Sequence, residues 1–400
     1  MLELFFALGF GILFGVVAGL MPGLHPNNTI PIILGMSFLF DPLSAAIVLV
    51  SSGIINIFIN FIPSILLGAP EDGTVLSVLP GHKLLMEGRG FEAIKLSVIG
   101  GLGGIIFSIA ILPVFALTIP SFYELIRPHI HLILIPAVAW MIFTEKKYGK
   151  IFALITFFAS GFLGLMVLDY SDAALFPLLS GLFGLPTLLI AIWSKTSLPK
   201  KFEECEQKMK LSELVKSISI GSIGGVMAGI LPGLGSAQST ALTQQAFRQK
   251  DRDGRKFLVS IGAVSSSDLV YSLLALYLIG NPRSGIAVAV SKLIEVRLSE
   301  LMLLISVIVI SAGLGVILTL KLTNISLKFL RKVNYSKLCM WTLVFVYILI
   351  FIFSGVLGLI IATIAMFIGL IPNYTNIRRT HSMGCLLLPT ICYFAAINII

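Results

Sequence analysis

Long apolar runs constrain the fold of this chain more than any other feature of its sequence. The stretches 96–120, 151–168 and 301–320 approach or reach the roughly 20 residues that a helix needs to cross a lipid bilayer. Only 12% of the 400 residues are charged, whereas about 25% are charged in a soluble domain. Such a chain has too few polar side chains to cover a water-facing surface. The sequence therefore predicts an all-α polytopic protein of the cell membrane.

Basic residues lie in the short loops between the apolar runs and give the chain its net charge of +9. This bias is typical of the cytoplasmic loops of membrane proteins, so we expect membrane lipid around the chain and no nucleic-acid partner. The N-terminal apolar segment carries Glu3 and has no basic start and no cleavage site, which predicts a retained membrane segment rather than a signal peptide. Five further spans are predicted in each half of the chain, at 42–68, 94–119, 130–144, 150–168 and 173–193, and at 257–280, 298–320, 338–354, 356–372 and 383–400.

Two polar interruptions of apolar runs resemble each other. GLMPGLHPNNTIP (19–31) and GILPGLGSAQSTA (229–241) both place Pro, Gly and polar residues where an apolar helix would otherwise continue. The likeness indicates an internal repeat, although membrane sequences rich in small residues also align with one another by chance. Three pairs of segments match in the same order along the chain: 15–29 with 225–239, 68–73 with 280–285, and 160–165 with 354–359.

These matches predict two inverted-topology repeats, each a re-entrant helical hairpin plus about five transmembrane helices. The first repeat would cover 1–195, with its hairpin at 2–40. A cytoplasmic linker at 196–210 would lead to the second repeat, 211–400, with its hairpin at 216–247. Because each half has an odd number of full spans, the two halves would have opposite orientations in the membrane. The alternative is that the hairpins cross the membrane fully instead of being re-entrant. Inverted repeats with broken helices are typical of secondary transporters, whose substrate sites lie at the repeat interface.

The hairpin tips are candidate anion sites. Polar residues after each Pro-Gly pair suit the N-terminal cap of a helix, and a helix N-terminus offers free N–H groups and about half a positive charge to an anion. A helix kink packed on a neighbour is the structural alternative. Arg283 could clamp a carboxylate with its planar guanidinium or extend to the membrane interface. The predicted substrate-binding residues are Pro22, Gly23, His25, Asn27, Asn28 and Thr29 in the first tip, Pro232, Gly233, Ser236, Gln238, Ser239 and Thr240 in the second tip, and Arg283.

A carboxylate inside an apolar span is costly and marks a functional site by default. Asp268 is such a residue, and the repeat sets it opposite Asn56. We predict that Na⁺ or H⁺ binds near Asp268 as a coupling ion, whereas a hydrogen bond between helices is the structural alternative. The predicted coupling-ion residues are Asn56, Asn60, Ser265, Ser266 and Asp268.

Several motifs together resemble a known family. They are LMPGLHPNNT, the segment ending in GAPEDG, LPGHKLLMEGRGFEAIKLS, GGLGG, SGFLGLMVLDYSDAALFPLLSGLFGLP and AGILPGLGSAQSTA. On these residues most of the chain resembles the large permease subunit of tripartite tricarboxylate transporters, the TctA-like family. The resemblance implies a permease for an organic anion, which in the classical systems works with a small membrane subunit and a periplasmic binding protein. Because this chain is shorter and its first tip reads HPNN instead of a glycine-rich pattern, it is more similar to short stand-alone relatives, including archaeal ones.

The expected function is a cation-coupled secondary transporter of a small organic anion, such as a di- or tricarboxylate, bound at the two opposed tips near the membrane midplane. The first alternative is a translocator (flippase) of a phosphate headgroup such as a lipid-linked phosphate, and the second is a membrane-embedded lipid enzyme. The scattered histidines and the four cysteines form no metal-binding pattern, so we expect no enzyme, no metal site and no cofactor beyond the coupling ion. No binding protein or small subunit is evident, and a homodimer stays open.

Overall fold

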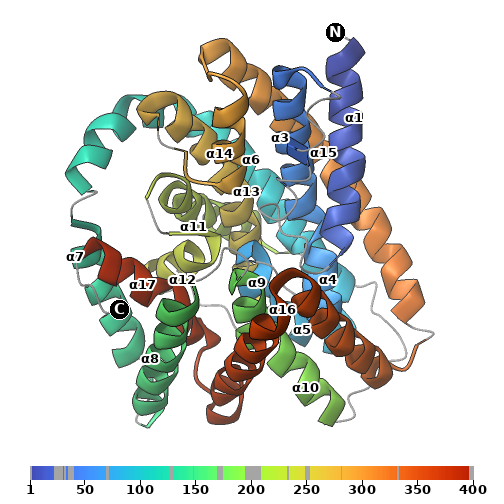
Figure 1. Cartoon of the computed structure of the whole chain (residues 1–400), viewed down its shortest axis with the longest axis vertical. Helices are drawn as coiled ribbons and strands as arrows, with labels where there is room; N and C mark the ends of the chain where they lie inside the picture. Colours follow the sequence, from blue (N-terminus) through green and yellow to red (C-terminus); the bar gives the residue numbers. More distant parts are fainter. Residues whose placement is uncertain are drawn as a thin grey trace.

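The computed structural model is helical throughout the part of the chain that it describes (Figure 1). The described residues are 2–21, 30, 33–34, 40–68, 72–126, 129–146, 148–168, 174–193, 209–231, 234–247, 253–280, 282–330 and 333–395. Within these ranges nine helices are long and apolar enough to cross a membrane, and none of the regular elements is a strand. The prediction of an all-α polytopic membrane protein is therefore confirmed.

The elements follow the apolar runs of the sequence. The first half contains α1 (Leu2–Leu20), α3 (Pro42–Ile59), α4 (Phe61–Leu67), η2 (Asp72–Ser77), α5 (Val78–Met86), α6 (Gly90–Ile126), α7 (Ile130–Phe143), α8 (Gly149–Leu168), α9 (Leu175–Leu179), η5 (Ser180–Gly184) and α10 (Leu185–Trp193). The second half contains α11 (Leu211–Ile230), α12 (Ser236–Phe247), α13 (Arg255–Ile279), α14 (Gly285–Leu293), α15 (Leu298–Leu330), α16 (Tyr335–Thr375), η6 (Arg379–Met383) and α17 (Gly384–Phe394).

The helices α3 and α13 form the core of the molecule and are almost entirely buried. α3 begins at Pro42, whose fixed φ suits the first helical position. Asp41 caps this helix by accepting hydrogen bonds from the N–H groups of Leu43 and Ser44, at 3.1 and 3.2 Å. A helix that is apolar on all sides must be surrounded by other helices. Because α3 and α13 carry the predicted polar residues, the fold keeps these residues away from lipid.

Glycine faces bring a second helix close to each core helix. A Cβ on Gly19 of α1 would lie 3.2 Å from Cα of Asn56, and a Cβ on Gly229 of α11 would lie 2.8 Å from the carbonyl oxygen of Asp268. Residues four positions apart share one face of a helix, so each set of glycines forms a single contact surface. The pairs α1–α3 and α11–α13 therefore share one packing pattern. The glycines are Gly11, Gly15 and Gly19 in α1, and Gly221, Gly225 and Gly229 in α11.

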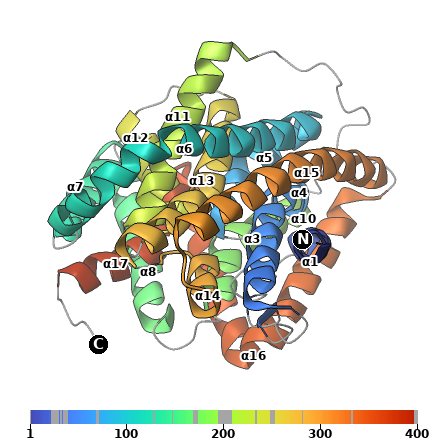
Figure 2. The ribbon, with the colours of Figure 1, turned by 90° about the horizontal axis from the view of Figure 1, so that it is seen from above.

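The long helices α6 and α15 each pack on the core helix of the other half, α6 on α13 and α15 on α3. Figure 2 shows α6 and α15 running across the molecule next to each other. A Cβ on Gly262 of α13 would lie 1.9 Å from the carbonyl oxygen of Ser97 of α6, so the two backbones touch there. The fully buried ring of Phe58 lies against both Gly101 of α6 and Gly315 of α15. The two halves are therefore interlocked rather than separate.

Two short segments also contact the opposite half. η2 of the first half packs on α12 and α13, and α14 of the second half packs on α3, where Ile286 lies over Gly53. In Figure 1, α14 lies near the top of the view, whereas α4 and α5, which follow α3, lie in the lower half. This arrangement is expected if the two core helices run in opposite directions. The orientation of the two halves across the membrane stays a prediction.

The element α16 consists of two helices that meet at Gly355. This residue has a φ of 62° and a ψ of −158°, a conformation that favours glycine and breaks the helix. The hydroxyl of Tyr347 lies 3.2 Å from Oγ1 of Thr363, so the two helices fold back on each other as a hairpin. The bend lies between the predicted spans 338–354 and 356–372.

One of the three sequence matches joins positions with different structures. The segment 160–165 lies inside the uninterrupted helix α8, whereas its match, 354–359, contains the bend at Gly355. This pair therefore does not mark equivalent places in a repeat.

α7, at the predicted span 130–144, has 14 residues and a length of about 21 Å, which is less than the roughly 30 Å of a bilayer's hydrocarbon core.

Candidate functional site

The turn of the first predicted tip, 22–29, lies outside the described residues, and so do Pro232 and Gly233 of the second tip. α1 ends at Leu20 before the first turn, and α11 ends at Ile230 before the second, after which α12 begins at Ser236. The described residues therefore show the second tip in more detail than the first. The predicted substrate residues outside the described ranges are Pro22, Gly23, His25, Asn27, Asn28, Thr29, Pro232 and Gly233.

A partly buried carboxylate, Asp268 of α13, lies beside the start of α12. The Ser236 hydroxyl donates a hydrogen bond of 2.8 Å to Oδ2 of Asp268, and the Ser272 hydroxyl donates one of 3.2 Å to Oδ1. Ser272 follows Asp268 by one turn of α13, while Ser236 is the first residue of α12. Because Gly229 packs directly on α13, the chain can turn back after α11 and bring Ser236 to Asp268. The structure thus joins a predicted substrate residue to a predicted coupling-ion residue.

Three buried side-chain oxygen atoms of α12 and α13 have no hydrogen-bond partner among the described residues. They are Oε1 of Gln238 and Oγ of Ser239 on α12, and Oγ of Ser267 on α13. Each side chain is less than a tenth exposed. A buried polar atom without a partner costs about 1–3 kcal/mol, and such atoms are rare unless a water, an ion or a ligand completes them. α12 and α13 therefore carry buried hydrogen-bonding groups that a polar ligand could complete.

The other predicted polar residues of α12 and α13 bond to backbone carbonyls. Thr240 donates to the carbonyl oxygen of Ser236 at 2.7 Å, and Ser265 donates to that of Ile261 at 3.0 Å. Ser266 donates to the carbonyl oxygen of Gly101 at 2.7 Å and so connects α13 to α6. These bonds give Ser265 and Ser266 structural partners, and the structure does not bring their hydroxyls to the Asp268 carboxylate.

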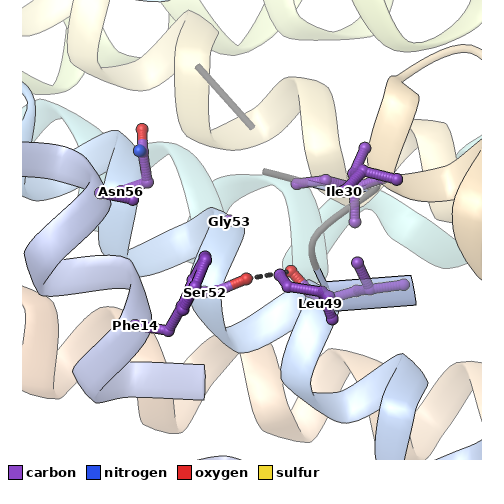
Figure 3. A pocket seen from close by; sticks show the side chains of 9 residues that line it. Phe14, Ile30, Leu49, Ser52, Gly53 and Asn56 are labelled. Carbon is purple, nitrogen blue, oxygen red and sulfur yellow. Dashed lines mark hydrogen bonds between the residues drawn. The ribbon is translucent and has the colours of Figure 1, made fainter. Parts of the chain in front are cut away.

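The first half has a narrow pocket lined by residues of α1 and α3 and by Ile286 of α14 (Figure 3). Asn56 lines this pocket together with Ser52, whose hydroxyl donates to the carbonyl oxygen of Leu49 at 3.0 Å. The lining is more apolar than the surroundings of Asp268, which is the repeat counterpart of Asn56. The remaining lining residues are Phe14, Ala18, Ile30, Ile33, Leu49, Gly53 and Ile286.

Asn60 belongs to a separate polar cluster. Its side-chain oxygen accepts hydrogen bonds from Ser64 of α4 and Thr74 of η2, at 3.0 and 2.7 Å. Asn60 is therefore not in a hydrogen-bonded group with Asp268. Ser64 and Thr74 were not among the predicted site residues, because neither stands out in its local segment. Ser267 was not among them either, although it directly precedes Asp268 in the run SSSD.

Arg283 contacts α6. Its guanidinium donates a hydrogen bond to the hydroxyl of Tyr123 and lies 5.1 Å from the centre of that ring. A cation over an aromatic face is stabilised by the ring quadrupole. Arg283 is therefore bound to an aromatic side chain of the first half. An anion that binds this guanidinium would also lie next to Tyr123.

The far end of α12 is held by a second polar cluster. Gln245 donates to Oγ1 of Thr144 at 3.1 Å and accepts from Arg378 at 2.8 Å. Glu145 lies 3.0 Å from Nε2 of the fully buried His381. Burial lowers the pKa of His381, and the hydrogen bond to Glu145 opposes this effect. The cluster fixes the end of α12 that lies away from Ser236.

The fold and the site define a multi-pass helical membrane protein with a hydrogen-bonded carboxylate at its centre. Within the described ranges no group of three or more His, Cys, Asp or Glu side chains could hold a metal ion. The chain belongs to the tripartite tricarboxylate transporter TctA family, whose family model matches residues 5–384. It is therefore a membrane transporter of the permease type and not an enzyme.

A relative of similar length occurs in an archaeon. The chain is 34% identical to the uncharacterized protein MJ1079 of Methanocaldococcus jannaschii over 387 residues, which cover 92% of this chain and 94% of the relative. This agrees with the expected resemblance to short, stand-alone members of the family. No solved structure matches the chain.

Proposed function

We propose that the chain is a cation-coupled secondary transporter that carries a small di- or tricarboxylate across the cell membrane. The family supports the tricarboxylate class of substrate. The observation that carries the proposal is the hydrogen bond of 2.8 Å between Ser236 and Asp268, which joins the start of α12 to a carboxylate in the core helix α13.

Asp268 is the proposed binding residue of the coupling ion, Na⁺ or H⁺. A carboxylate away from water requires hydrogen-bond donors and positive charge. Ser236 and Ser272 supply two donors, and no ion pair joins Asp268 to a described Lys, Arg or His. A sodium ion or a proton would supply the missing positive charge.

The proposed anion site is the N-terminus of α12. Its free N–H groups favour a carboxylate. Ser239, whose buried hydroxyl has no partner among the described residues, follows within the first turn. An ionised and unoccupied Asp268 next to this position would repel the anion. A cation on Asp268 removes the repulsion, so cation and anion would bind more tightly together than alone. The matched first tip, including Asn27, Asn28 and Thr29, would complete the site from the opposite half.

The proposal is tested by ligand-dependent thermal unfolding of the purified protein. Citrate, succinate, malate, tartrate, phosphate and isoprenyl phosphate would each be titrated at constant ionic strength, in Na⁺ or in choline. A ligand that binds only the folded state raises its free energy of unfolding with the logarithm of one plus the ratio of ligand concentration to Kd. We expect one carboxylate to stabilise the protein, more strongly in Na⁺ or at the lower of two pH values.

Two variants make this test specific for the site. Asp268→Asn should abolish the dependence on the cation, whereas the matched variant Asp253→Asn, at an exposed position, should behave as the wild type. Stabilisation by isoprenyl phosphate alone would instead identify a translocator of lipid-linked phosphate. A full panel without any stabilising carboxylate would contradict the proposal.

A further inference from the structure

We infer that the cavity between the starts of α1 and α3 binds a membrane lipid whose headgroup carries an ammonium group. Glu3, Asp41 and Ser44 would accept hydrogen bonds from the ammonium, and the apolar side chains around them would contact the acyl chains. This site is separate from the proposed sites of the transported anion and the coupling ion, so the inference does not depend on the proposed function.

The cavity lies at the end of the molecule where α1 and α3 begin. Its volume is about 640 Å³, and residues of both helix starts line it. The two helices run in the same direction, because Gly11 lies against Val48 and Gly19 lies against Ile59. Figure 1 shows α1 and α3 side by side. A parallel pair of helices brings both starts to the same end of the molecule, and the cavity lies between them.

The polar side chains that line the cavity can accept hydrogen bonds from a cation. Asp41 uses Oδ2 to cap α3, and Glu3 forms no ion pair with a described Lys, Arg or His. Ser44 is 1% exposed, and its Oγ makes no hydrogen bond of regular geometry with a described residue. The Ser44 hydroxyl hydrogen can turn toward Asp41, which lowers the pKa of that carboxyl and leaves the lone pairs of Oγ for a donor.

The equivalent position of the second half holds a lysine. In the register of the sequence matches, Glu3 corresponds to Glu213 of α11, and Ser44 corresponds to Lys256 of α13. Nζ of Lys256 lies 2.6 Å from Oε1 of Glu213. In the second half an ammonium group of the protein therefore neutralises the glutamate at the helix start. In the first half the serine side chain is too short to do so.

The glycine contacts support this register. A Cβ on Gly11 would lie 2.8 Å from the carbonyl oxygen of Val48, and a Cβ on Gly221 would lie 2.4 Å from that of Ser260. The same matches set Gly11 opposite Gly221 and Val48 opposite Ser260. α1 therefore packs on α3 at the level at which α11 packs on α13, so Ser44 and Lys256 occupy equivalent places.

The apolar part of the lining favours a lipid over a free amine. Leu2, Phe5 and Phe6 line the cavity together with Phe40, and the first three are 87%, 66% and 68% exposed. Such side chains on a membrane helix contact acyl chains. The first 82 residues contain no Lys or Arg, so no residue close in sequence supplies a positive charge. A lipid with an ammonium headgroup brings the charge and the acyl chains together.

Purely structural roles of the two acidic residues are the competing explanation. A carboxylate in the first turn of a helix is stabilised by the helix dipole, and Glu3 lies in the first turn of α1. Asp41 caps α3. In that case the cavity contains only water, and no lipid headgroup would stabilise the protein selectively.

The experiment measures thermal unfolding of the purified full-length protein at a constant concentration of nonionic detergent. Dioctanoyl phosphatidylethanolamine is titrated, and its N-acetylated form is the control ligand, because it has the same phosphate and acyl chains but no ammonium. The dependence of the midpoint on ligand concentration gives Kd. We expect phosphatidylethanolamine to stabilise the wild type and the N-acetylated form to bind about 10-fold more weakly or less, as expected for loss of hydrogen bonds to a charged group.

Three variants locate the binding site. Glu3→Gln removes one charge and should raise the Kd of phosphatidylethanolamine about 3- to 10-fold, a modest effect because the residue is exposed. Glu295→Gln, at another exposed position, is the matched control and should bind as the wild type. Ser44→Lys supplies an ammonium group as Lys256 does in the second half. It should raise the unfolding midpoint without lipid and abolish the response to phosphatidylethanolamine.

The remaining outcomes would overturn the inference. Equal Kd values in the wild type, Glu3→Gln and Ser44→Lys would mean that the lipid binds elsewhere, and Glu3→Gln decides this even if Ser44→Lys does not fold. Equal stabilisation by the two lipids would show that the ammonium is not recognised. Stabilisation by octylamine but not by phosphatidylethanolamine would identify a free amine as the ligand. No stabilisation by either would show that the cavity binds no ammonium group. Each of these results leaves the proposed transport of a carboxylate unaffected.

Discussion

The hydroxyl of Ser236 lies 2.8 Å from Oδ2 of Asp268, although 32 positions separate the two residues in the chain. Ser236 is the first residue of α12, and Asp268 lies in the middle of α13. A hydrogen bond from a hydroxyl to a carboxylate is stronger when the carboxylate is ionised. The contact between the start of α12 and α13 should therefore be stronger when Asp268 is ionised.

Replacing Ser236 tests this dependence. Ser236→Ala removes the shorter of the two hydrogen bonds to Asp268 and should lower the free energy of unfolding by about 1–3 kcal/mol. Ser236→Thr keeps the hydroxyl and should lose less. Ser272→Ala removes the longer bond, 3.2 Å, and should have a smaller effect than Ser236→Ala. Thermal unfolding of the three purified variants measures these differences. If Ser236→Ala unfolds at the same midpoint temperature as the wild type, the assigned hydrogen bond is contradicted.

Because the backbones of α6 and α13 touch at Gly262, we expect that this position tolerates no side chain. A Cβ on Gly262 would lie 1.9 Å from the carbonyl oxygen of Ser97. Gly262→Ala should therefore destabilise the protein by about 1–3 kcal/mol, because the helices must move apart. The control is Gly313→Ala on α15, where nothing lies within 4 Å of the added Cβ and where alanine favours the helix by up to about 1 kcal/mol. Chemical unfolding of both variants in the same detergent compares them directly.

The inverted topology predicts that the starts of the two core helices lie on opposite sides of the membrane. Pro42 and Asp253 are exposed residues at the starts of α3 and α13. In a background with the four native cysteines replaced by serine, Pro42→Cys should react with a membrane-impermeant maleimide in intact cells. Asp253→Cys lies in a basic loop that we expect inside, so it should react only after permeabilisation. Labelling of both variants from the same side would show that the halves are not inverted.

The partly buried imidazole of His82 predicts a pH dependence of stability. Burial lowers the pKa of His82 from 6.5 to about 4, a hydrogen bond with the backbone of Ile65 opposes this, and the charge of Arg379 adds to the lowering. Between these two values the unfolded chain binds a proton more readily than the folded one. Stability should therefore fall as the pH decreases from 6.5 to about 4, with a loss of up to about 3 kcal/mol from this group.

The variant His82→Gln isolates this contribution. It cannot take up the proton, so its unfolding free energy should change less than that of the wild type over the same pH range. Burial also lowers the pKa of His381, which acts in the same direction in both proteins. Identical pH profiles for the variant and the wild type would mean that His82 is not the group responsible.

Local features of the sequence predicted the class of protein and most helix positions. The run 301–320 is apolar enough to span a bilayer whatever its neighbours are, and it lies within α15. The adjacent residues Asp41 and Pro42 are sufficient to mark the start of α3. The bend at Gly355 lies between two predicted spans. The polar tips were also recognisable, because Pro and Gly interrupt an apolar helix wherever it is packed.

The partners of the site residues could not be predicted in the same way. The sequence assigned Ser236 to the substrate and Asp268 to the coupling ion, and the structure joins them by one hydrogen bond. It grouped Asn60 with Asp268, whereas the structure places Asn60 with Ser64 and Thr74.

The sequence by itself thus determined that this is a polytopic helical membrane protein with two polar interruptions, because the transfer of a helix into lipid depends on consecutive residues. Only the tertiary structure decided which polar groups meet. A hydrogen bond acts over about 3 Å, so Ser236 can reach Asp268 only because the close glycine contact of α11 with α13 lets the chain turn back at that level of the core helix.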